Sequence, residues 1–288
     1  MRSLLFVPGD SARKLEKGLA SGTDVLICDL EDSVAAGDKA AARAVTLGFL
    51  REAMTTAGRP KLFVRLNALD SGQIDADLDA VIPAGPDGVM LPKAGGGRDI
   101  AHLGAKLAVR EAEADLADGA TRIVAVATET AASVFGLGTY AGASRRLDGI
   151  AWGGEDLGAD IGVLSSKDEA GGWTEPFRMV RNLCLFGAVS AGIAPIDTVH
   201  TAFRDLEALE RECRIAARDG FTAKMAIHPA QVAVINAVFT PSPTELERAR
   251  RIIAAFAQAG NAGVIGLDGE MLDRPHLKRA ERLLARAG

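Results

Sequence analysis

The sequence predicts an α/β protein built as a (β/α)8 barrel with a C-terminal helical extension. Short apolar runs alternate with amphipathic segments of helix length through residues 1–239. Eight apolar runs can be counted, and eight such strand–helix units fit a closed parallel barrel. Charged or polar residues follow nearly every run, where the carboxyl end of a strand is expected. In a barrel of this type those ends carry the functional side chains.

Each strand is predicted where apolar residues form a short run, and each helix where apolar residues recur at helical spacing. Ser11 is expected to cap the first helix. The predicted strands are 4–8, 24–30, 61–66, 87–91, 122–127, 147–152, 193–196 and 224–227. The predicted helices are 11–19, 39–53, 74–81, 100–116, 130–135, 176–191, 202–217 and 229–237. A long loop is expected over 158–172.

A doubly wound open sheet is the alternative fold. Such a sheet usually carries a glycine-rich dinucleotide fingerprint after an early strand. The run from Gly95 to Gly97 follows the fourth strand but lacks the GxGxxG spacing. It is therefore interpreted as a turn, which favours the barrel.

The prolines Pro241 and Pro243 break the alternating pattern. The sequence thus predicts a barrel domain over residues 1–239 and a separate extension over 240–288. A helix over 244–258 with Thr244 as its cap, a loop-rich stretch over 260–269 and a basic helix starting near Pro275 are expected there. The extension exceeds what a barrel needs, so a lid or an inter-subunit arm is the hypothesis for it.

Composition excludes several classes of protein. The net charge is −5 and aromatics make up 5% of the chain, which argues against nucleic-acid binding. No run approaches the roughly 18 apolar residues of a membrane span, and Pro8 and Gly9 interrupt the N-terminal run. Cys28, Cys184 and Cys213 show no CxxC spacing and are expected to be buried free thiols. A cytoplasmic location follows as the expectation.

Two acidic residues follow neighbouring predicted strands. Glu129 comes after the strand over 122–127, and Asp156 comes after the strand over 147–152. The interval of 27 residues is one strand–helix–strand step, which brings both carboxylates to the same end of adjacent strands. Oxygen ligands of this kind suit Mg²⁺, and also Mn²⁺. The alternative is that both are ordinary acids at helix N-termini.

Further charged residues lie at or just after the carboxyl ends of the second, third and fourth predicted strands. Asp29, Glu31 and Asp32 are expected to hold metal-bound waters in a second shell around the ion. Arg65 either pairs with one of these acids or presents a planar fork to a substrate carboxylate or thioester oxygen. For Lys93, too, the sequence leaves both a structural and a functional role open.

A series of short motifs extends over nearly the whole chain. They include Leu5-Phe-Val-Pro-Gly-Asp10, Asp29-Leu-Glu-Asp-Ser-Val34, Val64-Arg-Leu-Asn67, Met90-Leu-Pro-Lys93, Gly154-Glu-Asp-Leu-Gly-Ala-Asp160, Lys224-Met-Ala-Ile-His-Pro-Ala-Gln231 and Gly269-Glu-Met-Leu-Asp-Arg-Pro275. In content and order they resemble the citrate lyase β-subunit-like proteins of the HpcH/HpaI aldolase superfamily. The resemblance implies a TIM barrel, usually a homotrimer, that makes or breaks a carbon–carbon bond in acyl-CoA substrates with Mg²⁺.

The resemblance also assigns roles to individual residues. It implies that Glu129 and Asp156 are the metal ligands and that Arg65 binds substrate and takes part in catalysis. It implies that Asp273, in the tail, is a catalytic acid that a neighbouring subunit often contributes. Arg13 and Lys93 are expected to bind substrate beside Arg65.

The function expected from these observations is Mg²⁺-dependent cleavage of a β-hydroxyacyl-CoA such as malyl-CoA or citramalyl-CoA. Two alternatives stay open: a citryl lyase subunit that acts on a thioester carried by an acyl carrier protein, and a malyl-CoA thioesterase or malate synthase-like activity. Ala127 and Thr128 replace the bulkier residues common before the glutamate, and the loop over 171–177 also departs from the family pattern. These departures leave the acyl group open.

Overall fold

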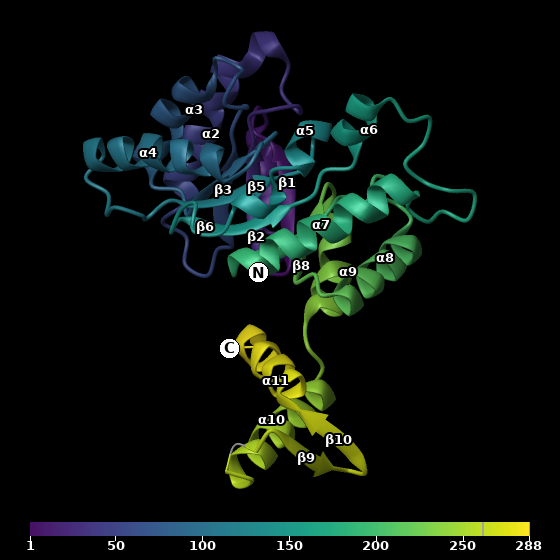
Figure 1. Ribbon diagram of the computed structural model, residues 1–288. Coiled ribbons are helices and arrows are strands. Elements are labelled where there is room, and N and C mark those ends of the chain that lie inside the picture. Colours follow the sequence, from purple (N-terminus) through teal and green to yellow (C-terminus); the bar gives the residue numbers. More distant parts are fainter. Residues whose placement is uncertain (261, 288) are drawn as a thin grey trace. The chain divides into compact units, whose positions relative to one another are not determined.

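The computed structural model describes residues 1–260 and 262–287. Eight parallel strands form a closed barrel in sequence order, and β8 pairs with β1 to close it (Figure 1). The (β/α)8 prediction is confirmed. The strands are β1 (Ser3–Pro8), β2 (Val25–Asp29), β3 (Lys61–Arg65), β4 (Gly88–Leu91), β5 (Arg122–Val126), β6 (Leu147–Ala151), β7 (Ala194–Asp197) and β8 (Ala223–Ala226).

Helices follow the strands, and Figure 1 shows α2, α3 and α4 grouped together beside the barrel. The helices are α1 (Ala12–Leu19), α2 (Lys39–Ala53), α3 (Ile74–Val81), α4 (Gly97–Glu113), α5 (Ala131–Val134), α6 (Glu155–Ile161), α7 (Glu175–Ala191), α8 (Leu206–Asp219) and α9 (Pro229–Phe239). Single turns of 3₁₀ helix lie at η1 (Ala36–Asp38), η2 (Ile82–Ala84) and η3 (Leu137–Thr139).

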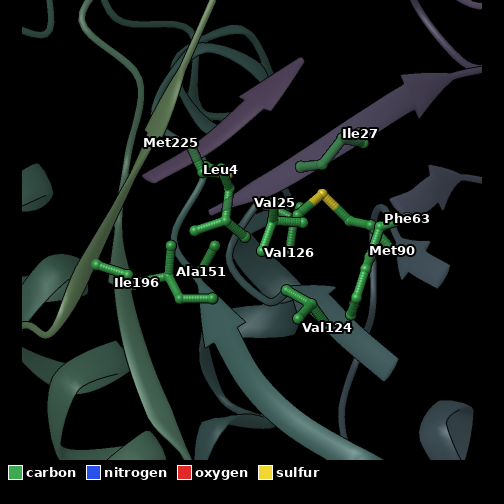
Figure 2. Packing of buried hydrophobic residues seen from close by; sticks show 11 residues of the cluster. Leu4, Val25, Ile27, Phe63, Met90, Val124, Val126, Ala151, Ile196 and Met225 are labelled. Atoms are coloured by element: carbon green, nitrogen blue, oxygen red, sulfur yellow. The ribbon is translucent and has the colours of Figure 1, made fainter. Parts of the chain in front are cut away.

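Side chains from all eight strands fill the barrel interior (Figure 2). Alternate residues of a strand point inward, because side chains alternate between the two faces. The interior also depends on Gly88, since a Cβ there would lie 2.4 Å from Cζ of Phe63. The buried cluster consists of Leu4, Val25, Ile27, Phe63, Met90, Val124, Val126, Ala151, Ile196, Ala223 and Met225.

Three helices differ clearly from the sequence predictions. The helix α4 spans Gly97–Glu113 rather than 100–116. The helix α6 is absent from the predicted helices. It continues to Ile161, so the loop expected from residue 158 begins only at Gly162. The helix expected from residue 202 begins at Leu206, where the Asp205 side chain accepts the N–H of Ala208 at 2.9 Å. An Asp in this position is a strong start signal, and it defines the helix better than apolar periodicity does.

The chain divides into two compact units, Met1–Asn236 and Ala237–Gly288. The second unit contains α10 (Pro243–Gln258), β9 (Val264–Leu267), β10 (Glu270–Asp273) and α11 (Arg274–Ala287), and it bears out the expected helical extension. It has a hydrophobic core of its own, built on Ala249, Ile252, Phe256, Leu272, Leu277 and Ala280.

Two details of this unit correct the sequence predictions. The stretch over 260–269, expected to be loop-rich, contains β9 and the turn of an antiparallel hairpin. Asp268 and Gly269 both have positive φ, 53° and 81°, as the tightest hairpin turns require. The cap of α10 is Ser242 rather than Thr244, and Ser242 and Glu245 form a reciprocal capping box.

The three cysteines are buried and free, as expected. Across residues 1–260 and 262–287, no helix is both long enough and apolar enough to cross a membrane.

Candidate active site

The inward-facing series of two strands ends in charged residues. Asp29 lies two positions beyond Ile27, and Arg65 lies two positions beyond Phe63, so both close the carboxyl end of the apolar interior. Arg65 donates from Nε and Nη2 to the two carboxylate oxygens of Asp29 at 2.7 and 2.6 Å. Its guanidinium carbon lies 4.8 Å from the centre of the Phe6 ring. This two-bond geometry fixes the plane of the guanidinium.

Glu31 approaches the same guanidinium from the loop after β2. Nη1 of Arg65 lies 2.7 Å from Oε2 of Glu31. The ammonium of Lys39 donates to the carbonyls of Leu30 and Glu31, both at 2.7 Å, and holds this loop in place. No sequence pattern indicates this role of Lys39, because the role depends on a contact between a helix start and a loop backbone.

Lys93 joins this group from the end of β4. Its ammonium forms an ion pair with Glu31 and lies 3.7 Å from Asp32 and 3.6 Å from Oδ1 of Asp156. Its main-chain N–H donates to Oε2 of Glu129. One residue therefore contacts the acids that follow β2, β5 and β6.

Glu129 and Asp156 occupy the ends of the neighbouring strands β5 and β6. Glu129 is buried, whereas Asp156 lies in the first turn of α6. The N–H of Gly153 donates to Oγ1 of Thr128 at 2.9 Å, which ties the two loops together. A Cβ at Gly153 would lie 2.7 Å from Cγ of Glu129, so only glycine leaves room for this carboxylate. Thr128 and Gly153 thus position the pair, a role the sequence interpretation missed.

Burial and charge shift the pKa values of these groups in opposite directions. Burial, together with the nearby charges of Glu31 and Asp156, raises the pKa of Glu129 to about 8. Burial also raises the pKa of Glu31 despite Arg65 and Lys93. Burial acts to raise the pKa of Asp29 too, but the hydrogen bonds and charge of Arg65 outweigh it and hold that pKa below the usual range. We call this carboxyl end of the barrel the mouth. It therefore has more carboxylates than its own cations can stabilise.

The donor set fits a hard divalent cation. Glu129 and Asp156 supply carboxylate oxygens, and burial, the main cause of the raised pKa of Glu129, makes its charged form costly unless a cation pairs with it. In the two described ranges, no group of three or more His, Cys, Asp or Glu side chains is arranged to hold a metal. Mg²⁺ needs only one or two protein carboxylates and completes its octahedron with water and substrate.

Two of the expected site residues, Arg13 and Asp273, take no part in the contacts described above. Arg13 lies in the first turn of α1, after β1, with its side chain exposed. Asp273 ends β10 in the second unit, where its Oδ1 lies 2.6 Å from Nδ1 of His276. The contacts described above join Asp29, Glu31, Asp32, Arg65, Lys93, Glu129 and Asp156.

The fold and this mouth define a class, the TIM-barrel enzymes whose acidic site lies at the carboxyl ends of the strands. The family model for HpcH/HpaI aldolase/citrate lyase matches residues 2–229, and one described as C–C bond lyase of the TIM-barrel fold matches residues 177–288. The chain belongs to the HpcH/HpaI aldolase/citrate lyase family. It is accordingly a carbon–carbon lyase of the aldolase superfamily, as the motifs imply.

Several relatives match the chain over nearly its full length. The (3S)-malyl-CoA thioesterase of Cereibacter sphaeroides is 35% identical over 99% of this chain and 94% of the relative. The citrate lyase subunit beta of Leuconostoc mesenteroides is 33% identical over 98% and 92%. The mitochondrial citramalyl-CoA lyase of Rattus norvegicus is 34% identical over 99% and 86%.

A similar solved structure is protein CitE from Mycobacterium tuberculosis in complex with magnesium, acetoacetate and coenzyme A. It superposes with a TM-score of 0.78 at 34% identity, covering 100% of this chain and 98% of that one. The magnesium in that relative agrees with the Mg²⁺ expected from the two carboxylates.

Proposed function

We propose that this protein is a Mg²⁺-dependent lyase that cleaves a β-hydroxyacyl-CoA such as malyl-CoA or citramalyl-CoA. The observation that carries the proposal is the guanidinium of Arg65, held in one plane by Asp29 and Glu31 in a mouth that also holds Glu129 and Asp156. The CoA esters named for two relatives, and the coenzyme A bound by a third, support this substrate class.

Each residue has a role in this proposal. Glu129 and Asp156 hold Mg²⁺, with Asp29, Glu31 and Asp32 around them. Bound Mg²⁺ increases the acidity of the substrate hydroxyl and stabilises the keto-acid product. The three contacts of Arg65 leave some of its five N–H donors for a substrate oxygen. The side chains of Arg13 and Lys93 bind substrate, as the family motifs imply.

The reaction divides the substrate between two fragments. A base removes the hydroxyl proton, the carbon–carbon bond breaks as the keto-acid carbonyl forms, and the bonding pair passes to the thioester fragment. Arg65 stabilises the negative charge that develops on the thioester oxygen. Asp273 returns a proton to the carbon, which releases the acyl-CoA. This last role rests on the tail motif that carries Asp273.

The test is to supply malyl-CoA and citramalyl-CoA with Mg²⁺ or with EDTA, and to trap any α-keto acid with phenylhydrazine. We expect metal-dependent release of keto acid from one ester, which also names the acyl group. A folded protein that binds Mg²⁺ but releases no keto acid from either ester would contradict lyase activity on free CoA esters.

Thioester hydrolysis is the second candidate, favoured by the 35% identity to a (3S)-malyl-CoA thioesterase. Release of free CoA thiol from malyl-CoA, without keto acid, distinguishes it from the lyase. A citryl lyase subunit is the third, favoured by the relative from Leuconostoc. That candidate requires activity on a thioester attached to an acyl carrier protein and a stable complex with the carrier.

A further inference from the structure

The ammonium of Lys93 lies among the acids that are proposed to surround a metal. It pairs with Glu31, and it lies 3.7 Å from Oδ2 of Asp32 and 3.6 Å from Oδ1 of Asp156. The main-chain N–H of the same residue donates to Glu129. Lys93 thus contacts both proposed metal ligands, one through its side chain and one through its backbone.

Lys93 is also the cation that balances the charges of Asp32 and Asp156. Arg65 forms its ion pairs with Asp29 and Glu31. Among the residues that the structure describes, Asp32 and Asp156 form ion pairs with Lys93 alone. Without a metal, this ammonium is therefore the cation that pairs with Asp156.

The backbone gives an independent indication. Lys93 has φ of 53°, a left-handed conformation that residues other than Gly, Asn and Asp seldom adopt. Glycine would accept this conformation without strain and would still supply the N–H to Glu129. A lysine side chain at a position that suits glycine is consistent with a role for its charge.

We infer that Lys93 is the internal counter-ion of the metal-free mouth, and that a divalent cation on Glu129 and Asp156 displaces its ammonium from Asp156. The inference rests on the proposed function, because it takes the same two carboxylates as ligands. A divalent ion and an ammonium repel each other at such short range, so they compete for Asp156. Displacement leaves Nζ near Glu31, available to an anionic group of the substrate, while the N–H continues to orient Glu129.

The test compares Lys93→Met with wild type by calorimetric Mg²⁺ titration and by thermal unfolding in EDTA. We expect the variant to bind Mg²⁺ at least about fivefold more tightly, because the competing charge is gone. We expect its metal-free form to unfold at a lower temperature, because Asp32 and Asp156 lose their cation. Lys93→Arg keeps the charge and should retain wild-type Mg²⁺ affinity. Lys106→Met is the matched control, since Lys106 pairs with Asp75 between surface helices.

The outcomes separate the inference from the proposed function. Wild type that binds no Mg²⁺ would overturn the metal-dependent function, and the inference with it. Wild type that binds Mg²⁺ while Lys93→Met binds it equally or less tightly would overturn the counter-ion role alone. Should Lys93→Met unfold in EDTA, recovery of the fold on adding Mg²⁺ supports the inference. Failure to recover contradicts it, because the metal should replace the lost charge.

Discussion

The guanidinium of Arg65 is held by both oxygens of Asp29 and by Glu31, so its position depends on its planar shape as well as its charge. Arg65→Lys keeps the charge but loses the paired hydrogen bonds and the fixed plane. We expect turnover of the CoA ester to fall by roughly 10²-fold, the usual effect of removing one stabilising donor. Steady-state kinetics of keto-acid release measures this.

Arg43→Lys provides the control for that substitution. Arg43 makes a similar pair of contacts, to Asp77 at 2.7 Å and Gln73 at 2.6 Å, but these belong to α2 and the start of α3. Its replacement should change stability and leave turnover near wild type. Equal losses of turnover in both variants would mean that Arg65 serves only the fold.

Asp156 and Asp32 both lie near Lys93, but only Asp156 is proposed to hold the metal. Asp156→Asn should weaken Mg²⁺ binding by more than about 100-fold, whereas Asp32→Asn should weaken it by about tenfold, because Asp32 acts through water. Calorimetric titration of the two variants measures the difference. A larger loss in the Asp32 variant would reverse the two assignments.

At this scale the sequence predicted that the acids and Arg65 gather, because each lies at or shortly beyond the end of a strand, and a parallel barrel brings those positions to one end. It could not predict the roles of Phe6, Lys39 and Thr128. Their contacts join segments that are distant in sequence, and they depend on side-chain conformations that no local pattern encodes.

Among the elements, α4 is tied to the start of β6 by a buried ion pair. Arg146 donates from Nη1 and Nη2 to the two carboxylate oxygens of Glu111, each at 2.7 Å. Glu111 also accepts the N–H groups of Gly119 and Thr121, at 2.9 and 2.7 Å, and so holds the loop before β5. Both charged side chains are buried.

Replacing Glu111 by Gln should therefore lower the free energy of unfolding by about 3 kcal/mol, because Arg146 loses its buried partner. Urea unfolding measures this. The control is Asp79→Asn. Asp79 lies on α3 and forms an exposed ion pair with Arg110 of α4, so its loss should change the free energy of unfolding by less than about 1 kcal/mol. Similar losses in the two variants would contradict the importance of burial.

The same pair predicts a pH dependence. Burial acts to raise the pKa of Glu111, but Arg146 and the backbone N–H groups outweigh it and lower the pKa from 4.5 to about 2. A lowered pKa means that the stabilisation is present above pH 4.5 and is lost as the pH falls towards 2. The difference in stability between wild type and Glu111→Gln should shrink across that interval. A difference that stays constant would assign the effect to packing.

The eight strands were predictable because each is a short apolar run between helices. The hairpin over β9 and β10 was missed, although Asp268 and Gly269 form a strong turn signal. Glycines on both sides of β9 weaken the apolar pattern, and the strands are partly exposed. The cap at Ser242 was missed because Pro243, taken as the end of the break, is the first residue of α10.

The whole molecule consists of two units with separate cores. The proposed metal ligands belong to the first unit, and Asp273 belongs to the second. In the proposed assignment, metal binding and proton return depend on different units. A variant of Asp273 should then lose turnover and keep its Mg²⁺ affinity.

This division allows a test of whether the second unit is a lid on its own barrel or an arm that serves a neighbouring subunit of the expected homotrimer. Glu129→Gln has a defective barrel and an intact tail, whereas Asp273→Asn has an intact barrel and a defective tail. Each alone should be inactive. If the tail acts between subunits, co-expressing the two should restore activity at about a quarter of the sites, because an intact barrel then meets an intact neighbouring tail. Mixed oligomers that form but stay inactive would show that each tail serves its own barrel, since no chain in the mixture carries both intact groups.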